Sequence, residues 1–305
     1  MVEAAMSKAM GFRELGGPEV LRLEEVPEPH AGPGEVRIRM KAAGLQAFDV
    51  AVLAGLIPVP EPGAFTVPGN EFAGVIDEIG EGVEGFAAGD EVLGFGRLGA
   101  YQELVVAAQD QVVPKPPEMP WEVAGAFTAA AQTADIAVEV INVGPGDTVL
   151  VHGAAGSVGA MAVQLSQLRG AKVLGVARPQ WHEQVRALGA IPLAYSEDFV
   201  ERVAPHGVTA SIDGVGGAAL EYTLELIKDR SRILTLVEHD RAGELGVRLT
   251  VNDRSASRLA RLAGLYAKGE LTHRIMATFP LAEAAEAMRT YQAGNIHGKI
   301  ALTMD

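Results

Sequence analysis

The residues with the clearest chemical signature form a glycine-rich segment, Gly153-Ala154-Ala155-Gly156-Ser157-Val158-Gly159. The apolar run at residues 148–151 predicts a buried strand before it, and the apolar periodicity of residues 158–168 predicts a helix after it, ended by Gly170. A glycine loop in this position directs backbone N–H groups and the positive end of the helix at an anion, typically a pyrophosphate. The segment therefore predicts a dinucleotide site, although a turn that only packs strand against helix would have similar residues.

The loop departs from the usual G-x-G-x-x-G pattern at its first position, where Ala154 stands. The tight turn must then be made with a methyl group present, and Gly153 can share that task. Gly156 is expected to let the backbone approach the phosphates, and Gly159 is expected to let the helix pack closely on the strand.

The choice of dinucleotide depends on the end of the next predicted strand, which reads Ala177-Arg178. An NAD-binding domain places an acidic residue about 20 residues past the loop, where it accepts from the ribose 2′-hydroxyl. No carboxylate stands there, and an arginine can pair with a 2′-phosphate. NADP(H) is therefore the predicted cofactor. Two alternatives stay open: a solvated Arg178, and a ribose contact made by Glu183.

Several classes of function are excluded by composition. The sequence contains no cysteine, which rules out disulfides, cysteine nucleophiles, iron–sulfur clusters and thiolate zinc sites. Its seven histidines lie far apart, so no metal site is expected. A net charge of -14 without clusters of Lys and Arg argues against nucleic-acid and membrane partners. No membrane span or signal peptide is visible, which predicts a cytoplasmic protein.

The elements that would position the loop fall into two kinds. Short alternating stretches before about residue 120, such as residues 35–40, predict antiparallel strands. The proline-rich residues 113–120 predict a domain boundary. Beyond it, apolar runs alternate with helical periods, which predicts an α/β fold with a doubly wound parallel Rossmann sheet. Its predicted strands are residues 148–151, 172–177, 210–213 and 232–237.

Two further segments bear on domain organisation and assembly. Residues 280–292 predict a helix and residues 298–303 a strand, which could close the Rossmann sheet or return to the first domain. Residues 246–251 have strand character, and an unpaired strand there would suit a homodimer formed by sheet extension.

Three segments, residues 68–75, 83–92 and 146–156, resemble the medium-chain dehydrogenase/reductase superfamily, in its zinc-free quinone oxidoreductase (zeta-crystallin-like) branch. The resemblance runs from residue 17 to residue 302. It implies a GroES-like β-rich domain, residues 1–123 and 272–305, with a Rossmann domain at residues 124–271 inserted in it. The zinc-dependent branch has a Cys near Gln46 and a His where Asn70 stands, and neither ligand is present here.

The resemblance also implies roles for individual residues. The amide of Gln46 is expected to donate to the substrate or the nicotinamide ribose, and Thr133 to lie beside the nicotinamide, whereas Asp49 is expected to cap the following helix. Neither Gln46 nor Thr133 is a clear acid or base. The expected cofactor-binding residues are the loop Gly153 to Gly159, Ala177, Arg178, Val215, Gly216 and Lys299. The expected substrate-pocket residues are Phe48, Ile57, Asn70 and Tyr101, with ordinary core packing as the alternative for Tyr101.

The chemistry that fits a metal-free site is hydride transfer from the nicotinamide to a quinone or an α,β-unsaturated carbonyl compound, because the cofactor supplies the reactivity. The aliphatic residues 51–57 offer no ring to stack a quinone, which favours an aliphatic or bulky enone. Two alternatives remain open. The protein could bind NADPH without redox turnover, as a sensor or structural protein, or it could be a cyclase or isomerase that uses the cofactor-binding cleft that the resemblance implies.

Overall fold

Two large sheets organise residues 5–304, which are the residues that the computed structural model describes. They belong to two separate units of the chain. Unit 1 contains the described residues of Met1–Ala129, Ser255–Glu270 and Arg274–Asp305, and unit 2 contains Ala130–Arg254 and Leu271–His273. Residues 1–4 and 305 of the predicted first domain lie outside the described residues.

The division differs from the predicted boundaries at three places, the smallest being Thr272 and His273, which belong to unit 2. The first boundary lies at Ala129, because the short helix after the proline-rich segment packs on strands of unit 1. Residues 255–270 also belong to unit 1, where the ring of Tyr266 packs edge-on against Phe127 at 5.9 Å.

Unit 1 is β-rich, as its alternating sequence predicted. Its strands are β1 (Met6–Gly11), β2 (Arg22–Pro27), β3 (Glu35–Leu45), β4 (Glu71–Ile79), β5 (Glu91–Phe95), β6 (Leu104–Ala108), β7 (Val112–Pro114), β13 (Ile275–Pro280) and β14 (Lys299–Thr303). Its helices are α1 (Ala47–Leu53), α2 (Trp121–Gly125), α9 (Ala256–Ala267) and α10 (Ala284–Gln292). Its short 3-10 helices are η1 (Pro18–Val20), η2 (Gln109–Gln111) and η6 (Leu281–Glu283).

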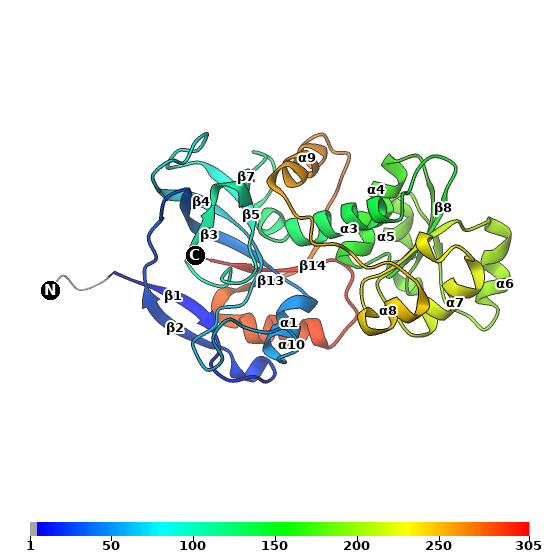
Figure 1. Ribbon diagram of the computed structural model, residues 1–305, viewed down its shortest axis with the longest axis horizontal. Coiled ribbons are helices and arrows are strands. Elements are labelled where there is room, and N and C mark those ends of the chain that lie inside the picture. Colours follow the sequence, from blue (N-terminus) through cyan, green and yellow to red (C-terminus); the bar gives the residue numbers. More distant parts are fainter. Residues whose placement is uncertain (1–4, 305) are drawn as a thin grey trace. The chain divides into compact units, whose positions relative to one another are not determined.

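The seven-stranded sheet of unit 1 has the order β13-β14-β3-β4-β5-β7, with β6 also paired to β3. The C-terminal strand β14, red in Figure 1, therefore pairs antiparallel with β3 of the N-terminal segment, in blue. This resolves the alternative that the sequence left open: the C-terminal strand returns to the first domain. The fold of this unit is GroES-like.

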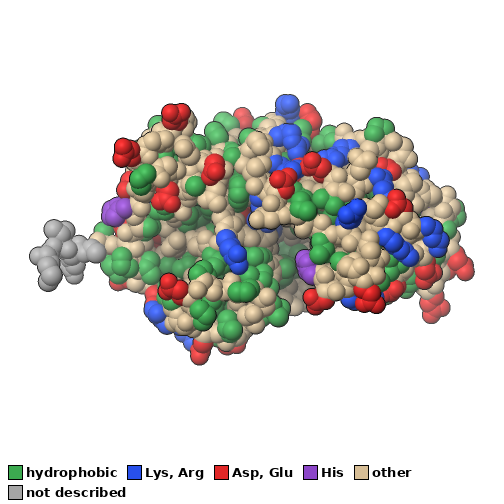
Figure 2. All heavy atoms as spheres, viewed as in Figure 1, with side chains coloured by type: hydrophobic (Ala, Val, Ile, Leu, Met, Phe, Trp, Pro, Cys, Tyr) green, Lys and Arg blue, Asp and Glu red, His purple; other side chains and the backbone are tan. Residues whose placement is uncertain are grey.

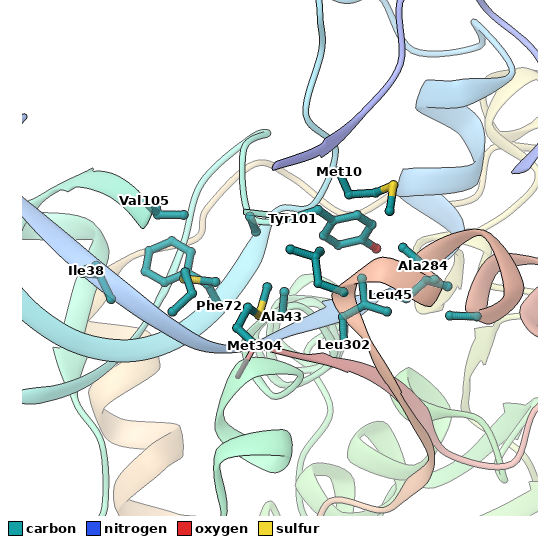
Figure 3. Close-up of a cluster of buried hydrophobic side chains, with 14 of the residues drawn as sticks. Met10, Ile38, Ala43, Leu45, Phe72, Tyr101, Val105, Ala284, Leu302 and Met304 are labelled. Carbon is teal, nitrogen blue, oxygen red and sulfur yellow. The ribbon is translucent and has the colours of Figure 1, made fainter. Parts of the chain in front are cut away.

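The core of unit 1 forms between this sheet and α10. Helix α10 buries Ala284, Ala287 and Met288, a spacing of three and four residues that places them on one face. Figure 3 shows side chains of β3, β4 and β14 meeting those of α10 in this cluster, with Tyr101 among them.

On the surface, Figure 2 shows acidic and basic side chains interspersed on the face in view.

Unit 2 is the α/β unit. Its strands are β8 (Thr148–His152), β9 (Lys172–Val176), β10 (Ile191–Leu193), β11 (Ala210–Asp213) and β12 (Ile233–Thr235). Its helices are α4 (Ser157–Leu168), α5 (His182–Ala187), α6 (Phe199–Val203), α7 (Ala218–Leu226), α8 (His239–Leu245) and most of α3 (Thr128–Val140), which begins in unit 1. Its short 3-10 helices are η3 (Pro179–Trp181), η4 (Ala204–His206) and η5 (Arg230–Arg232).

All five strands of this sheet run parallel in the order β10-β9-β8-β11-β12. Numbered within the unit, this order is 3-2-1-4-5, which is the doubly wound arrangement predicted from the sequence. Each strand is apolar because helices cover both faces of a parallel sheet. No helix among residues 5–304 combines the length and the apolar character needed to cross a membrane.

The predicted strand at residues 246–251 is wrong. Only Arg248 pairs there, through one parallel bridge to Leu234. Its N–H donates to Ile233 and its carbonyl accepts from Thr235, so the segment touches the outer edge of β12 at a single residue. Gly246, the first residue of the segment, has φ of +69° and caps α8.

Candidate functional site

The glycine loop lies where the sequence placed it, between β8 and α4. The N–H groups of Gly153 and Ala154 both donate to the carbonyl of Val176 on β9, at 3.1 and 3.0 Å, which fixes the start of the turn. Gly153 has φ of +77°, a conformation that favours glycine, and therefore makes the turn that Ala154 cannot. The methyl of Ala154 is fully buried and lies over Gly175, where a Cβ would come within 3.0 Å of it.

Helix α4 starts without acceptors for its first N–H groups. Its first backbone bond runs from Ala160 N to Gly156 O at 2.8 Å, so the N–H groups of Ser157, Val158 and Gly159 have no acceptor within the helix. Gly159 is required at its position, because a Cβ would lie 2.2 Å from the carbonyl oxygen of Gly153. These residues form a cradle of backbone donors at a helix N-terminus, which fits a phosphate group.

Two other predicted segments begin at the same edge of the sheet. In the strand register, His152 at the end of β8 pairs with Val176 of β9 and with Asp213 of β11. Ala177 and Arg178 follow the first partner, and the turn that contains Val215 follows the second. A Cβ on Gly153 would lie 3.4 Å from a methyl of Val215, so this turn lies beside the loop. Unit 2 thus brings together its expected cofactor residues.

The turn after β11 is held by Asp213, a residue that sequence reasoning passed over. Its buried carboxylate accepts from the N–H groups of Val215 and Gly216, at 2.9 and 2.8 Å, and from the hydroxyl of Thr235 at 2.9 Å. Gly216 has φ of +76°, which explains the glycine. The only sequence signal was an aspartate at the end of an apolar strand.

His152 is a second residue that sequence reasoning did not assign. It is buried, and its ring nitrogens bond the hydroxyls of Tyr195 at 2.7 Å and Thr223 at 2.8 Å. Burial lowers the pKa of His152 to about 4, so the ring is neutral at physiological pH. The imidazole therefore ties the end of β8 to α7 and to the segment after β10.

Two residues bear on the expected 2′-phosphate position. Arg178 is exposed directly after β9 and precedes η3. Glu183, the alternative ribose partner, pairs with Arg186 one helical turn later in α5. Both residues thus follow the carboxyl end of β9.

Unit 1 gathers four of its polar side chains at one end of β14, β3 and β4. Ile300 pairs with Leu45 in the register of β14 and β3, and Ala43 pairs with Phe72 in that of β3 and β4. Lys299, Gln46, Asn70 and Glu71 lie at this end of the three strands. The antiparallel register thus brings together residues that are far apart in the sequence.

The centre of this cluster is a buried ion pair. Lys299 Nζ lies 2.6 Å from Glu71 Oε1, and the two side chains are 2% and 0% exposed. The other carboxylate oxygen of Glu71 accepts from Ala129 N at 2.6 Å. Gly44 makes room for this carboxylate, since a Cβ there would lie 2.1 Å from Glu71 Oε1. Glu71 and Gly44 were missed from the sequence, although a charged residue inside an apolar strand signalled the first.

Both polar atoms of the Gln46 side chain are engaged within unit 1. Its Oε1 accepts from Lys299 Nζ at 3.4 Å, and its Nε2 donates to Asn70 Oδ1 through a short hydrogen bond. Lys299 was expected at the cofactor, but in this structure its ammonium group forms an ion pair with Glu71 and donates to Gln46. Asp49 caps α1 as predicted, accepting from Gln46 N at 3.0 Å.

The remaining expected residues lie in different surroundings. Tyr101 is fully buried, and its hydroxyl donates to Asp49 at 3.0 Å, so it positions the start of α1 and has no surface for a substrate. Phe48 and Ile57 are half-buried and pack against the core of unit 1. Thr133 is half-buried in α3. Among residues 5–304, no group of three or more His, Cys, Asp and Glu side chains could hold a metal ion.

Comparisons with known proteins find family matches in both units. The profile described as "Alcohol dehydrogenase GroES-like domain" matches residues 32–117, and "Zinc-binding dehydrogenase" matches residues 188–302. The synaptic vesicle membrane protein VAT-1 homolog of Rattus norvegicus is 30% identical over 332 residues, which cover 94% of this chain and 82% of the relative. A spectinabilin polyketide synthase protein of Streptomyces orinoci is 33% identical over 314 residues, 95% of this chain but 14% of that protein.

Solved structures agree with these matches. The quinone oxidoreductase of Coxiella burnetii superposes with a TM-score of 0.90 at 27% identity, covering 99% of this chain and 100% of the other. A mycobacterial protein whose structure is complexed with NADPH has a TM-score of 0.85 at 27% identity, covering 97% and 99% of the two chains.

Proposed function

Because the chain belongs to the medium-chain dehydrogenase/reductase superfamily, in its quinone oxidoreductase branch, it is an oxidoreductase that uses a nicotinamide cofactor, and we propose that it reduces conjugated carbonyl compounds with NADPH. The observation that carries the proposal is the cradle of free N–H groups at Ser157, Val158 and Gly159, beside the turn at Val215. It lies at the carboxyl ends of β8 and β11, the switch point where doubly wound sheets bind nucleotides.

The preference for NADPH over NADH rests on charge at the end of β9. A 2′-phosphate would meet the guanidinium of Arg178, which can bind it in a bidentate manner. Glu183 is the acid that could instead accept from a ribose hydroxyl, but its carboxylate already pairs with Arg186. The NADPH complex of the mycobacterial neighbour is consistent with this preference.

The substrate class rests on residues of unit 1. A bound nicotinamide supplies hydride, and the protein then has to orient the acceptor, exclude water and stabilise charge on its oxygen. Phe48 and Ile57 offer apolar surface, and Gln46 and Asn70 offer amides. The segment 51–57 presents only aliphatic residues and glycine, so we favour a small-molecule enone of aliphatic character over a flat quinone.

The test is the loss of NADPH absorbance with a panel of quinones and enones, run beside NADH. Turnover with enones at a higher kcat/KM for NADPH is the expected result. Binding of NADPH without oxidation across the panel would replace the proposal with a non-redox binding protein. Product formation with NADPH unchanged would replace it with a cyclase or isomerase.

Assembly and location complete the proposal. We expect a cytoplasmic homodimer that needs neither nucleic acid nor membrane. Since residues 246–251 do not form the predicted strand, the dimer would have to use another surface. A monomeric mass in solution at micromolar concentration would contradict the dimer.

A further inference from the structure

The buried lysine determines which way the neighbouring amides face. An ammonium group can only donate, so the oxygen of Gln46 must be the atom that lies 3.4 Å from Lys299 Nζ. The Nε2 atom of Gln46 then points to Asn70 and has to find an acceptor there, which only Oδ1 of Asn70 provides. Amide orientations are otherwise a matter of inference, but here the chemistry of one cation decides both.

The orientation leaves one amide nitrogen at the end of the chain of hydrogen bonds. Within the described part of the chain, residues 5–304, nothing accepts a hydrogen bond from Asn70 Nδ2. This nitrogen is also not among the fully buried, unpartnered atoms of those residues, so it retains contact with solvent. The residue as a whole is only 4% exposed. Asn70 is thus almost completely buried, with its amide nitrogen still accessible.

The backbone around Asn70 is fixed on both sides. Its carbonyl accepts from Gly96 N at 3.1 Å, and the N–H of the preceding Gly69 donates to Asp49 at 3.1 Å. Gly69 has φ of +94° and lies against Tyr101, where a Cβ would come within 2.5 Å of the ring. The donor is thus held in place before any ligand arrives, which is what stabilisation of a developing charge requires.

A positive charge stands behind this donor. Lys299 is 2% exposed and its charge is balanced by Glu71 at 2.6 Å, so what reaches Gln46 is the hydrogen bond that the ammonium group donates in a medium that screens poorly. Hydrogen bonds in such a chain polarise one another, each by roughly 10–30%. The direction of all bonds is the same, from the ammonium to Gln46 and from Gln46 to Asn70, which makes the terminal N–H bonds more acidic and suited to an oxyanion.

We propose that Asn70 is the residue that donates to the carbonyl oxygen of the substrate, with Gln46 and Lys299 as positioning residues behind it; the catalytic part of this inference rests on the proposed function. When hydride reaches the β-carbon of an enone, the electron pair of the C=C bond moves toward the carbonyl and leaves an enolate oxygen. Asn70 donates hydrogen bonds to that oxygen and transfers no proton. Water supplies the proton that the α-carbon takes up.

The first test uses the cofactor-free protein and the ionised form of 4-nitrophenol, an oxyanion probe, titrated by absorbance. Asn70→Leu and Asn70→Asp both remove the donor, and each is expected to weaken binding by about tenfold or more. Asn252→Leu, at an exposed amide, is the matched control and should bind as the wild type does. Equal affinity in the wild type and both Asn70 variants, or no binding to the wild type at millimolar probe, would overturn the inference.

The second test separates the donor from the residues behind it. Loss of a single oxyanion donor lowers kcat by about 10²- to 10³-fold, so Asn70→Leu should lose kcat on that scale while its affinity for NADPH stays unchanged. Gln46→Leu should lose less, about tenfold, since Asn70 remains. Lys299→Arg, which keeps the charge, should recover most of the probe affinity lost in Lys299→Met. A larger loss for Gln46→Leu than for Asn70→Leu would assign the donor to Gln46 instead.

The two proposals fail in different ways. If the wild type turns over no quinone or enone, the proposed function falls, yet probe binding that depends on Asn70 still establishes an oxyanion site. If turnover occurs but is indifferent to Asn70, the function stands and the assignment of Asn70 falls.

Discussion

Removal of the Lys299 charge should destabilise unit 1 strongly. In Lys299→Met the carboxylate of Glu71, which is 0% exposed, loses a partner 2.6 Å away. Breaking a buried ion pair from one side costs about 3–5 kcal/mol, because the remaining charge stays buried without compensation. The hydrogen bond from Ala129 N to the other oxygen is retained and offsets only part of this cost. The free energy of unfolding should therefore fall by an amount in this range.

The chain offers a reporter for each unit. Trp121 lies in unit 1, with Lys115 Nζ 4.8 Å from its ring centre, whereas Trp181 lies in unit 2. In a Trp181→Phe background, the fluorescence of Trp121 in urea follows unit 1 alone. The double variant Glu71→Gln with Lys299→Met removes both charges and should regain about 2 kcal/mol relative to Lys299→Met. A loss below about 1 kcal/mol in the single variant, or no recovery in the double, would refute the reasoning.

Three other predictions concern unit 2, one of them with a control variant in unit 1. Arg178→Asp should raise the KM for NADPH far more than the KM for NADH, and equal changes in steady-state kinetics would contradict a 2′-phosphate contact. Gly159→Ala places a Cβ 2.2 Å from a loop carbonyl and should weaken NADPH binding by about tenfold or more, measured by fluorescence titration. Gly264→Ala in α9, where a Cβ meets nothing within 4 Å, should leave that affinity unchanged and add about 0.5–1 kcal/mol of stability. The pKa of His152 falls from 6.5 to about 4 on folding, so the unfolded chain binds the proton more tightly; unfolding followed by Trp181 should become easier as pH falls from 6.5 to 4. His152→Gln should flatten that dependence, and an unchanged slope would contradict the burial argument.

The Rossmann unit could be predicted from the sequence because its signals are local. Each parallel strand is a short apolar run, and the glycine loop follows the first of them directly. The errors lie at strand ends: residues 232–237 were expected as a strand, but β12 ends at Thr235, where the chain turns so that Leu236 N bonds Asp213 O at 2.8 Å. Tertiary contacts of this kind leave no periodic trace in the sequence.

The polar cluster of unit 1 could not be predicted in the same way. Gln46 and Lys299 are 253 positions apart, and their contact depends on the register of β14 against β3. The resemblance implied a role at the substrate or the nicotinamide ribose for Gln46 and a place in the substrate pocket for Asn70, but not which of their atoms are engaged. That information came from the ion pair of Lys299 with Glu71, which orients both amides. For Tyr101 the sequence left a substrate contact and core packing open, and its complete burial in the assembled core decides for packing.

The most direct test of the central claim is the fate of the hydride. NADPH deuterated at C4 of the nicotinamide, supplied with an enone that the wild type reduces, should yield product with deuterium at the β-carbon and an equal amount of oxidised cofactor. Product without deuterium, or no consumption of NADPH with any quinone or enone, would contradict the account.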